Sequence, residues 1–419
     1  MKKALLYTLG CKLNQAESVL AAEKLAVEGY QILKSNQESK ADLIFINTCA
    51  VTARAAAKSR HAVSKMAREN SQAEIVVAGC LAQNDPRGLG EMPGVSRVIG
   101  TATQWMDSYL VTESKGAVRT APLPFPRIPF LHRVRPLLKI QDGCDQNCTY
   151  CIIPALRGRL RSEPLSKLIS NAAELVSAGA SEIVLTGVRI GAWGIDSGEG
   201  NLCTLLNALL KINENYRIRL GSIEPWELDE ELLDLVAHNP RICSHLHIPL
   251  QHTDPDVIAR MGRPPIEKSL RVLAEFGREF PDVGIGCDLI SGFPGETAEV
   301  FQTHYNTLLN LPLAYLHIFP FSPRPNTPAQ HWRTTADFPE MNRRIELLRN
   351  SNRQMHRRFQ ARQIGRTAMF ITDSPKPGAK WTTAVSDNYL RIKLPATEEM
   401  GTPHEIKITP QNLINYPFE

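Results

Sequence analysis

The chain has 419 residues, of which 43% are hydrophobic and 22% charged, and its formal net charge at pH 7 is +5. This composition is typical of a globular protein with two or three domains, and it excludes a mainly disordered or fibrous chain. The longest apolar runs are far shorter than the roughly 20 residues that cross a bilayer, so no transmembrane helix is expected. The mild positive charge permits nucleic-acid binding without indicating it.

Residues 1–110 alternate short β-prone runs with helical ones, which predicts an N-terminal domain built on a doubly wound, mainly parallel sheet. The expected strands are 4–8, 31–34, 43–47, 74–78 and 97–99, with helices at 14–28 and 51–69. The first eleven residues resemble a lipoprotein signal only superficially, because their apolar stretch is at the lower limit of signal-peptide length. We therefore expect a cytoplasmic protein whose cysteines stay reduced.

A proline-rich linker, 111–136, precedes a second domain, 137–360, that contains six strand-then-helix units. Six such units predict a partial α/β barrel, shorter than the closed eight-unit barrel, with its mouth at the carboxyl ends of the strands. The expected strands are 137–141, 182–186, 217–222, 245–250, 284–290 and 314–319. The helices between them are expected at 165–177, 202–212, 230–237, 268–280 and 298–311.

The last domain, 361–419, has short β-prone runs between turn residues, which predicts a small β-barrel. The helical stretch 341–366 is rich in arginine and carries much of the positive charge. Arginines neutralise RNA phosphates without reading sequence, and the candidates are Arg343, Arg344, Arg353, Arg357 and Arg358. An ordinary exposed helix face is the alternative, since apolar residues recur there at helical spacing. Likewise, Trp381 and Tyr389 could stack on bases or pack in the core.

Three cysteines stand on one predicted loop after the first strand of the second domain: Cys144, Cys148 and Cys151. Thiolates spaced this closely wrap one face of an iron–sulfur cube, ligating three irons and leaving the fourth open for a substrate or cofactor. The alternative is a zinc site, which normally has four ligands, commonly as two separated pairs. No second pair lies nearby in the sequence, so the spacing favours the iron–sulfur cluster.

A second set of cysteines is scattered in the sequence, but each member directly follows a predicted strand of the N-terminal domain: Cys11, Cys49 and Cys80. In the common strand order 2-1-3-4-5 these strands are neighbours, and parallel strands end at the same sheet edge. Three thiols would then converge there as ligands of a second cluster. The alternative is buried structural cysteine, which is our interpretation of the remaining three: Cys203, Cys243 and Cys287.

The loop bearing Cys144, Cys148 and Cys151 is that of the radical S-adenosylmethionine (SAM) enzymes, and its combination with the segments 8–15, 47–49 and 78–80 resembles the methylthiotransferase family. Further matching segments are 185–187, 193–194, 222–225, 247–251, 292–297 and 319–329, so the resemblance covers nearly the whole chain. Positions that depart from the family pattern are Arg189, His252, Thr253, Cys287 and the stretch 262–265. None is a cluster cysteine, and all concern the substrate side.

The resemblance implies two 4Fe-4S clusters and SAM as cofactors. The cluster on Cys144, Cys148 and Cys151 would chelate SAM through its open iron, and the auxiliary cluster on Cys11, Cys49 and Cys80 would carry the sulfur to be transferred. Residues at the barrel mouth would hold SAM, and the candidates are Thr186, Gly187, Ser222, Glu224 and Gln251. The final domain would correspond to the family's RNA-binding TRAM domain.

Within the family, the segments 47–52 and 57–60 are most similar to the branch that converts N6-threonylcarbamoyladenosine beside the tRNA anticodon to its 2-methylthio derivative. The implied partners are tRNA, a flavodoxin- or ferredoxin-like electron donor and a sulfur source. The alternative enzymes act on isopentenyladenosine of tRNA or on a ribosomal protein. A further alternative is not an enzyme but an RNA-binding protein whose domains are stabilised by bound metal.

Overall fold

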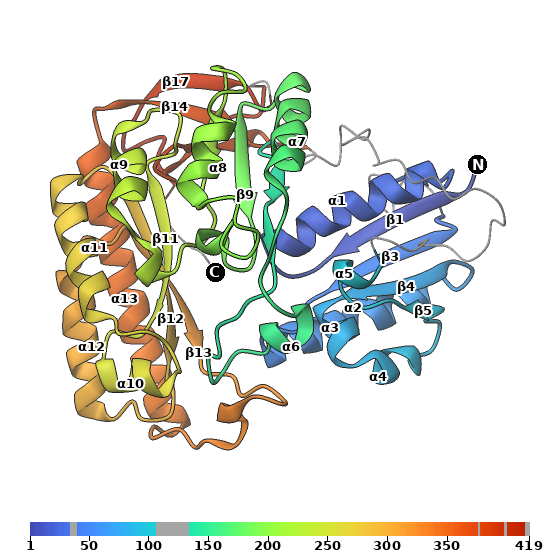
Figure 1. The fold of residues 1–419 in the computed structure, drawn as a ribbon, viewed down its shortest axis with the longest axis horizontal. Helices are drawn as coiled ribbons and strands as arrows, with labels where there is room; N and C mark the ends of the chain where they lie inside the picture. The colour runs from blue at the N-terminus through green and yellow to red at the C-terminus, as the bar shows by residue number, and fades with distance from the viewer. Residues whose placement is uncertain (34–39, 106–133, 376–377, 398–399, 415–419) are drawn as a thin grey trace.

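The computed structural model describes residues 1–33, 40–105, 134–375, 378–397 and 400–414. Figure 1 shows an N-terminal α/β layer in blue, a larger α/β part that curves around a central space, and a C-terminal sheet in red across one end of it. No helix within these described ranges has the length and apolarity to cross a membrane. Most of the expected linker 111–136 lies outside the described residues.

The N-terminal sheet is fully parallel and has the strand order β2-β1-β3-β4-β5, which confirms the doubly wound fold. Its strands are β1 (Lys3–Thr8), β2 (Gln31–Ile32), β3 (Leu43–Thr48), β4 (Glu74–Gly79) and β5 (Arg97–Val98). All six residues of β3 are buried, as expected of a central strand covered on both faces. Its helices are α1 (Lys12–Val27), α2 (Ala53–Glu69), α3 (Cys80–Asn84), α4 (Pro86–Gly90) and α5 (Ala102–Trp105).

The predicted six-unit partial barrel is confirmed. Its strands form two parallel sheets, β10-β9-β6 and β11-β12-β13, which are connected by isolated bridges from Ile218 to Ile242 and from Ser222 to His247. The six strands are β6 (Leu137–Lys139), β9 (Glu182–Thr186), β10 (Arg217–Arg219), β11 (His245–Gln251), β12 (Gly284–Ser291) and β13 (Tyr315–Pro320). Helices α9, α11, α12 and α13 line one flank of the barrel in Figure 1.

The helices of the barrel are α6 (Ile153–Arg157), α7 (Leu165–Ser177), α8 (Leu202–Leu209), α9 (Glu230–His238), α10 (Pro255–Arg260), α11 (Glu267–Glu279) and α12 (Ala298–Asn310). Short 3-10 turns are η2 (Ile190–Ala192), η3 (Pro225–Glu227) and η4 (Pro328–His331). Two expected strands are shorter than predicted. The third ends at Arg219, and the first is interrupted after Lys139 because β7 (Gln141–Asp142) pairs instead with β8 (Arg161–Ser162).

The C-terminal part consists of α13 (Phe338–Gln363) and an antiparallel sheet of order β16-β15-β14-β17. The helix begins earlier than the expected residue 341 because Asp337 caps it by accepting a hydrogen bond from Glu340 N–H. The strands are β14 (Thr367–Thr372), β15 (Trp381–Ser386), β16 (Arg391–Pro395) and β17 (Pro403–Lys407).

The C-terminal sheet closes the barrel at the amino ends of its strands, opposite the mouth. Arg217 donates hydrogen bonds to the carbonyls of Met369 and Val385, and Arg219 donates to those of Ser386 and Asp387. Both guanidinium groups also pair with Glu182 at the start of β9. A buried charge cluster therefore fixes the sheet to the barrel floor.

Candidate functional site

The loop that carries Cys144, Cys148 and Cys151 runs from β7 to α6 at the carboxyl end of the first barrel strand. Cys144 N–H donates to Gly158 O at 3.1 Å, and Cys151 N–H donates to Cys148 O at 3.0 Å. Gly143 begins the loop at φ +68°, where a side chain would overlap Arg159 O. A tight turn that only glycine allows thus projects the three thiols from one compact loop.

The three thiols of this loop lie in an environment suited to a cluster. Gln146 N–H points at Cys144 Sγ from 3.4 Å, and Arg263 Nη1 lies 3.9 Å from Cys148 Sγ. Burial raises the pKa of all three thiols, that of Cys151 to about 12, whereas the backbone N–H of Gln146 and the Arg263 charge act in the opposite direction. N–H groups directed at sulfur are the second layer of contacts that iron–sulfur thiolates use.

The ligand chemistry of this loop favours iron and sulfide over a single zinc ion. Three cysteines on one loop match an iron–sulfur cluster with one open iron, whereas a structural zinc ion normally has four protein ligands. Among the described residues, another group of three potential ligands lies within 4.8 Å and consists of His247, Asp288 and His317.

The sheet brings the second cysteine set to one edge, as its strand order predicts. Cys11, Cys49 and Cys80 follow β1, β3 and β4, which are adjacent in the sheet. A Cβ on Gly10 would lie 2.9 Å from Cys49 Cβ and 3.2 Å from its Sγ, so Cys49 packs directly on the backbone beside Cys11. Gly79, at φ +91°, has no space for a side chain beside Thr48 O.

The second set is held by hydrogen bonds from neighbouring side chains. Asn14 Nδ2 donates to Leu9 O and Thr48 O at 2.9 Å each, which ties together the turns before Cys11 and Cys49. Ser59 Oγ accepts from Cys49 N–H at 3.0 Å. Burial raises the pKa of Cys80 to about 12 and raises that of Cys49, while Cys11 is exposed. Cys11 is therefore the member of this set that lies at the surface.

One buried arginine joins the two cysteine sites. Arg157, the last residue of α6, donates from Nη1 to Glu17 Oε1 at 2.7 Å and to Asp142 Oδ1 at 3.0 Å, and from Nη2 to Asn14 Oδ1 at 2.9 Å. Lys139 Nζ binds the same two carboxylates at 3.0 and 2.7 Å. Arg157 cannot be recognised from the sequence, because nothing in a lone arginine after Leu156 indicates a partner 140 residues away.

The five residues expected at the barrel mouth are placed at or beside the strand ends. Thr186 ends β9 and is buried, Gly187 follows it, and Ser222 is exposed beyond β10. A Cβ on Gly187 would lie 2.9 Å from Gln141 O, so the segment 186–189 packs closely on the first strand. Gln141 Oε1 accepts from Val188 N–H and Arg189 N–H at 2.9 and 2.7 Å. Gln141 is a supporting residue that the sequence analysis missed.

Glu224 and Gln251 lie at the same mouth, next to the cysteine loop. Arg263 Nη2 donates to Glu224 Oε2 at 2.5 Å and to Pro249 O at 2.7 Å, and its Nη1 lies close to Cys148. Gln251 adopts φ +65°, an unusual backbone conformation for a residue other than glycine. Such conformations concentrate at functional sites. Arg263 belongs to the stretch 262–265 that departs from the family pattern.

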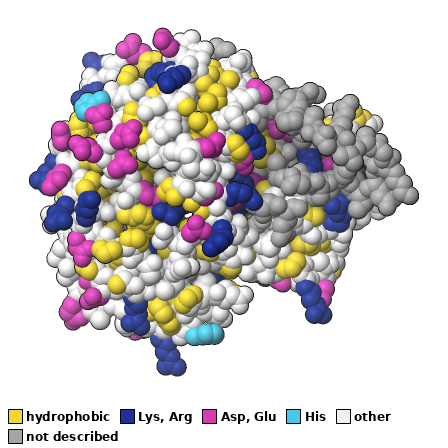
Figure 2. All heavy atoms as spheres, viewed as in Figure 1, with side chains coloured by type: hydrophobic (Ala, Val, Ile, Leu, Met, Phe, Trp, Pro, Cys, Tyr) yellow, Lys and Arg dark blue, Asp and Glu magenta, His cyan; other side chains and the backbone are white. Residues whose placement is uncertain are grey.

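The expected RNA-contact arginines on α13 differ in their surroundings. Arg344 is 2% exposed and binds Glu296 at 2.7 Å and Glu340 at 2.8 Å, so it belongs to the packing between α12 and α13 and cannot reach a phosphate. Arg343 and Arg353 are exposed and paired with Glu340 and Glu346. Arg357 and Arg358 are exposed. On the face shown in Figure 2, basic and acidic side chains are interspersed rather than gathered in one patch.

The two aromatic candidates for RNA stacking, Trp381 and Tyr389, also differ in their surroundings. Trp381 is 52% exposed, and Lys393 Nζ lies 4.6 Å from its ring centroid. Tyr389 points into the barrel floor, where its ring stacks on His245 with centroids 4.6 Å apart. Tyr389 is therefore not presented to RNA on the outer surface. The three cysteines assigned to the core, Cys203, Cys243 and Cys287, are buried as expected.

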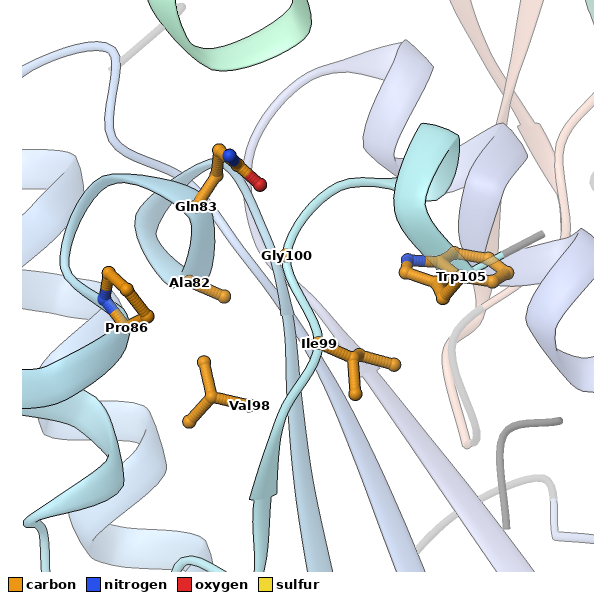
Figure 3. A pocket seen from close by; sticks show the side chains of 7 residues that line it. All are labelled: Ala82, Gln83, Pro86, Val98, Ile99, Gly100 and Trp105. Carbon is orange, nitrogen blue, oxygen red and sulfur yellow. The ribbon is translucent and has the colours of Figure 1, made fainter. Parts of the chain in front are cut away.

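A cavity of about 420 Å³ adjoins α3, the helix that begins at Cys80. Its lining comes from α3, α4, β5 and α5, as Figure 3 shows: Ala82, Gln83, Pro86, Val98, Ile99, Gly100 and Trp105. The polar side-chain groups among its described lining residues are the amide of Gln83 and the ring nitrogen of Trp105. The described residues of this lining offer no thiolate, imidazole or carboxylate for a metal.

A partial six-unit barrel with three cysteines on the loop after its first strand defines a radical SAM protein, whose cofactors are SAM and a 4Fe-4S cluster. The radical SAM superfamily matches residues 138–308, and the Uncharacterized protein family UPF0004 matches residues 3–100. The chain has the same fold as a radical SAM methyltransferase, TsrM, from Kitasatospora setae, with a TM-score of 0.55, 15% sequence identity, and coverage of 79% of this chain and 77% of that one.

Two relatives place the chain more narrowly. It is 33% identical over 408 residues to a threonylcarbamoyladenosine tRNA methylthiotransferase, MtaB, from Aquifex aeolicus, covering 94% of this chain and 97% of the relative. It is 32% identical over 344 residues to a ribosomal protein uS12 methylthiotransferase, RimO, from Lachnoclostridium phytofermentans, covering 78% and 77%. The chain belongs to the radical SAM methylthiotransferase family and is an enzyme of that type.

Proposed function

We propose that the chain methylthiolates N6-threonylcarbamoyladenosine in tRNA, next to the anticodon. The observation that carries the proposal is the pair of three-cysteine sites, on the sheet edge of one domain and at the barrel mouth of the next, joined by the Arg157 network. A methylthio transfer requires one centre that activates the substrate carbon and another that supplies sulfur. The alignment with MtaB covers more of both chains than the alignment with the ribosomal-protein enzyme, which favours the tRNA nucleoside.

In this proposal Cys144, Cys148 and Cys151 hold a 4Fe-4S cluster and its SAM. When bound, these groups supply a carbon-centred radical able to remove hydrogen from the adenine ring, chemistry that no amino-acid side chain provides. Gln141 fixes the loop 187–189 beside the cofactor, and the Glu224–Arg263 pair orients the guanidinium toward Cys148. Thr186, Gly187, Ser222 and Gln251 complete the SAM-binding rim.

Cys11, Cys49 and Cys80 are proposed to hold the auxiliary 4Fe-4S cluster that carries the transferred sulfur. Exposed Cys11 faces the approaching substrate, whereas buried Cys49 and Cys80 exclude water from the inner side. The remaining partners are a flavodoxin- or ferredoxin-like electron donor and a sulfur source that restores the second cluster. Arg343, Arg353, Arg357 and Arg358 on α13 are proposed to contact tRNA phosphates.

The two clusters are tested by replacing one cysteine from each set after anaerobic reconstitution. The unaltered chain should bind about eight irons. Cys49→Ala should keep about half of the iron and cleave SAM without transferring a methylthio group, whereas Cys144→Ala should lose both reactions. Cys203→Ala is the matched control, since Cys203 is buried in the barrel core. Zinc in place of iron, or loss of SAM cleavage in Cys49→Ala, would refute two separate clusters.

The nucleoside is tested by mass spectrometry of tRNA from a strain that lacks the gene, with and without the gene supplied in trans. We expect 2-methylthio-N6-threonylcarbamoyladenosine to disappear in the deletion strain and return with the intact gene. Loss of the isopentenyl derivative instead, or loss of a methylthio group on a ribosomal protein, would assign the chain to another branch. Unchanged methylthio groups in all three would refute the enzymatic proposal.

A further inference from the structure

A second cavity, of about 280 Å³, lies inside the barrel near its floor, and we call it the lumen cavity. Its wall is formed by the starts of β6 and β9, by Arg219 of β10, and by the C-terminal sheet with Asp373, Ser374, Tyr389 and Arg391. Lys12 also lines it, although Lys12 belongs to the N-terminal domain. All three parts of the chain therefore contribute to the lumen cavity.

Most charges around the lumen cavity are paired. Arg135 Nη2 binds Asp373 Oδ1 at 2.6 Å, and Arg219 Nε binds Glu182 Oε1 at 2.6 Å. Arg391 Nη2 donates to Tyr389 Oη at 3.4 Å. The acids that line the cavity are Glu182 and Asp373, so both are already engaged by arginines. The lining therefore has more positive than negative charge.

The lining holds four cations and two acids, and Lys12 is the cation that belongs to the N-terminal domain. It makes no hydrogen bond and no ion pair with any residue of the described ranges. Its side chain is solvent-accessible and lines the lumen cavity together with the guanidinium groups of Arg135 and Arg219. A lysine in this position is stabilised by an anion that enters the cavity.

The wall of the barrel between the lumen cavity and the mouth is polar as well. Tyr315 Oη bridges His245 Nε2 at 2.9 Å and His247 Nδ1 at 3.0 Å. Asp288 Oδ1 lies 3.0 Å from His247 Nε2 and 3.0 Å from His317 Nδ1. Inward-facing residues of β11, β12 and β13 thus form a hydrogen-bonded layer suited to a polar rather than an aliphatic group.

We propose that the lumen cavity binds the carboxylate of the substrate's threonylcarbamoyl group, with Lys12 as its counter-ion. This inference rests on the proposed function. A substrate adenine whose C2 faces the cysteine sites directs its N6 substituent to another side of the ring, toward the barrel interior. Lys12 directly follows Cys11, so the residue that binds the carboxylate is joined to a residue of the sulfur-carrying site. An isopentenyl group has no charge for Lys12 and would leave the ammonium unpaired.

The test compares three anticodon stem-loops as substrates of the reconstituted enzyme. They carry threonylcarbamoyladenosine, the same nucleoside as its methyl ester, and unmodified adenosine. The variants are Lys12→Gln, which removes the charge, and Lys12→Arg, which keeps it. Lys65→Gln, on the exposed face of α2, is the matched control. Iron content and SAM cleavage without RNA are measured first, so that a damaged auxiliary site is recognised.

We expect Lys12→Gln to weaken binding of the free-carboxylate stem-loop about 10- to 100-fold, as for loss of a hydrogen bond to a charged group. Lys12→Arg should restore most of this affinity, and the methyl ester should bind both proteins alike. Equal weakening for all three stem-loops would overturn the inference and assign Lys12 to an RNA phosphate. An unchanged affinity in Lys12→Gln would also overturn it. If the intact enzyme methylthiolates none of the stem-loops, the proposed function itself fails.

Discussion

The Arg157 network offers the sharpest test of how the two cysteine sites are held together. Arg157→Leu removes four hydrogen bonds, of 2.7 to 3.1 Å, to Glu17, Asp142 and Asn14. It leaves two buried carboxylates with Lys139 as their remaining cation. Breaking a buried ion pair by removing one partner costs 3–5 kcal/mol, and we expect about 3 kcal/mol because Lys139 still neutralises part of the charge.

Native-state hydrogen exchange measures this cost where it arises, since a chain with several domains has no single free energy of unfolding. A loss of about 3 kcal/mol corresponds to about 100-fold faster exchange in α1 and α6, with β14–β17 unaffected. Arg357→Leu, on the exposed face of α13, is the control. The double variant Arg157→Leu, Glu17→Leu should recover part of the loss, because Asp142 and Lys139 then form a balanced pair. Unchanged exchange in α1 would refute the reasoning.

Three other predictions follow from single side chains. Burial and the charge of Glu174 raise the pKa of Glu23 to about 7. The stability that the protonated carboxyl allows is therefore complete below pH 4.5 and is lost as the pH rises through 7. Glu23→Gln should stabilise α1 by about 3 kcal/mol at pH 8 and by less than about 1 kcal/mol at pH 5, as measured by native-state hydrogen exchange of the variant against the unaltered chain at each pH. Gly79→Ala should abolish iron binding at the second cysteine set, whereas Gly29→Ala, at a similar φ with open space around it, should cost only about 1 kcal/mol and keep the iron; iron retained in Gly79→Ala would contradict this. Replacing both Arg357 and Arg358 with serine should lower the slope of log affinity for tRNA against log salt by about 2, and an unchanged slope would exclude them from the interface.

The positions of the cysteines could be predicted because they depend on local rules. Parallel strands end at one edge of a sheet, so the ends of β1, β3 and β4 follow from the alternation of strands and helices and one common strand order. The three-cysteine loop needs still less, since its cysteines are separated by three and two residues and one tight turn brings them together. Fully buried strands such as β3 can be recognised from their apolar composition alone.

Contacts between residues far apart in the sequence could not be predicted, because they leave no periodic pattern in the sequence. Arg344 and Arg357 look alike in an arginine-rich helix, yet Arg344 meets the buried carboxylate of Glu296 and Arg357 meets solvent. Tyr389 in the last domain is an aromatic residue in a β-prone run, and only the docked sheet shows that it fills the barrel floor. Long-range pairing of charges is decided by the assembled structure, not by the neighbours of each residue.

The docked C-terminal sheet is held at a fixed distance from the barrel mouth, which affects which part of a large substrate can reach the mouth. The sheet cannot swing away from the barrel without exposing Glu182 and leaving the guanidinium of Arg219 without the carbonyls of Ser386 and Asp387. The span from that sheet to the barrel mouth is therefore a rigid length rather than a tether. A ligand bound at the sheet would place at the mouth only the part of itself that lies at this fixed distance. The enzyme would therefore select a position in its substrate by its distance from the bound part as well as by its chemistry.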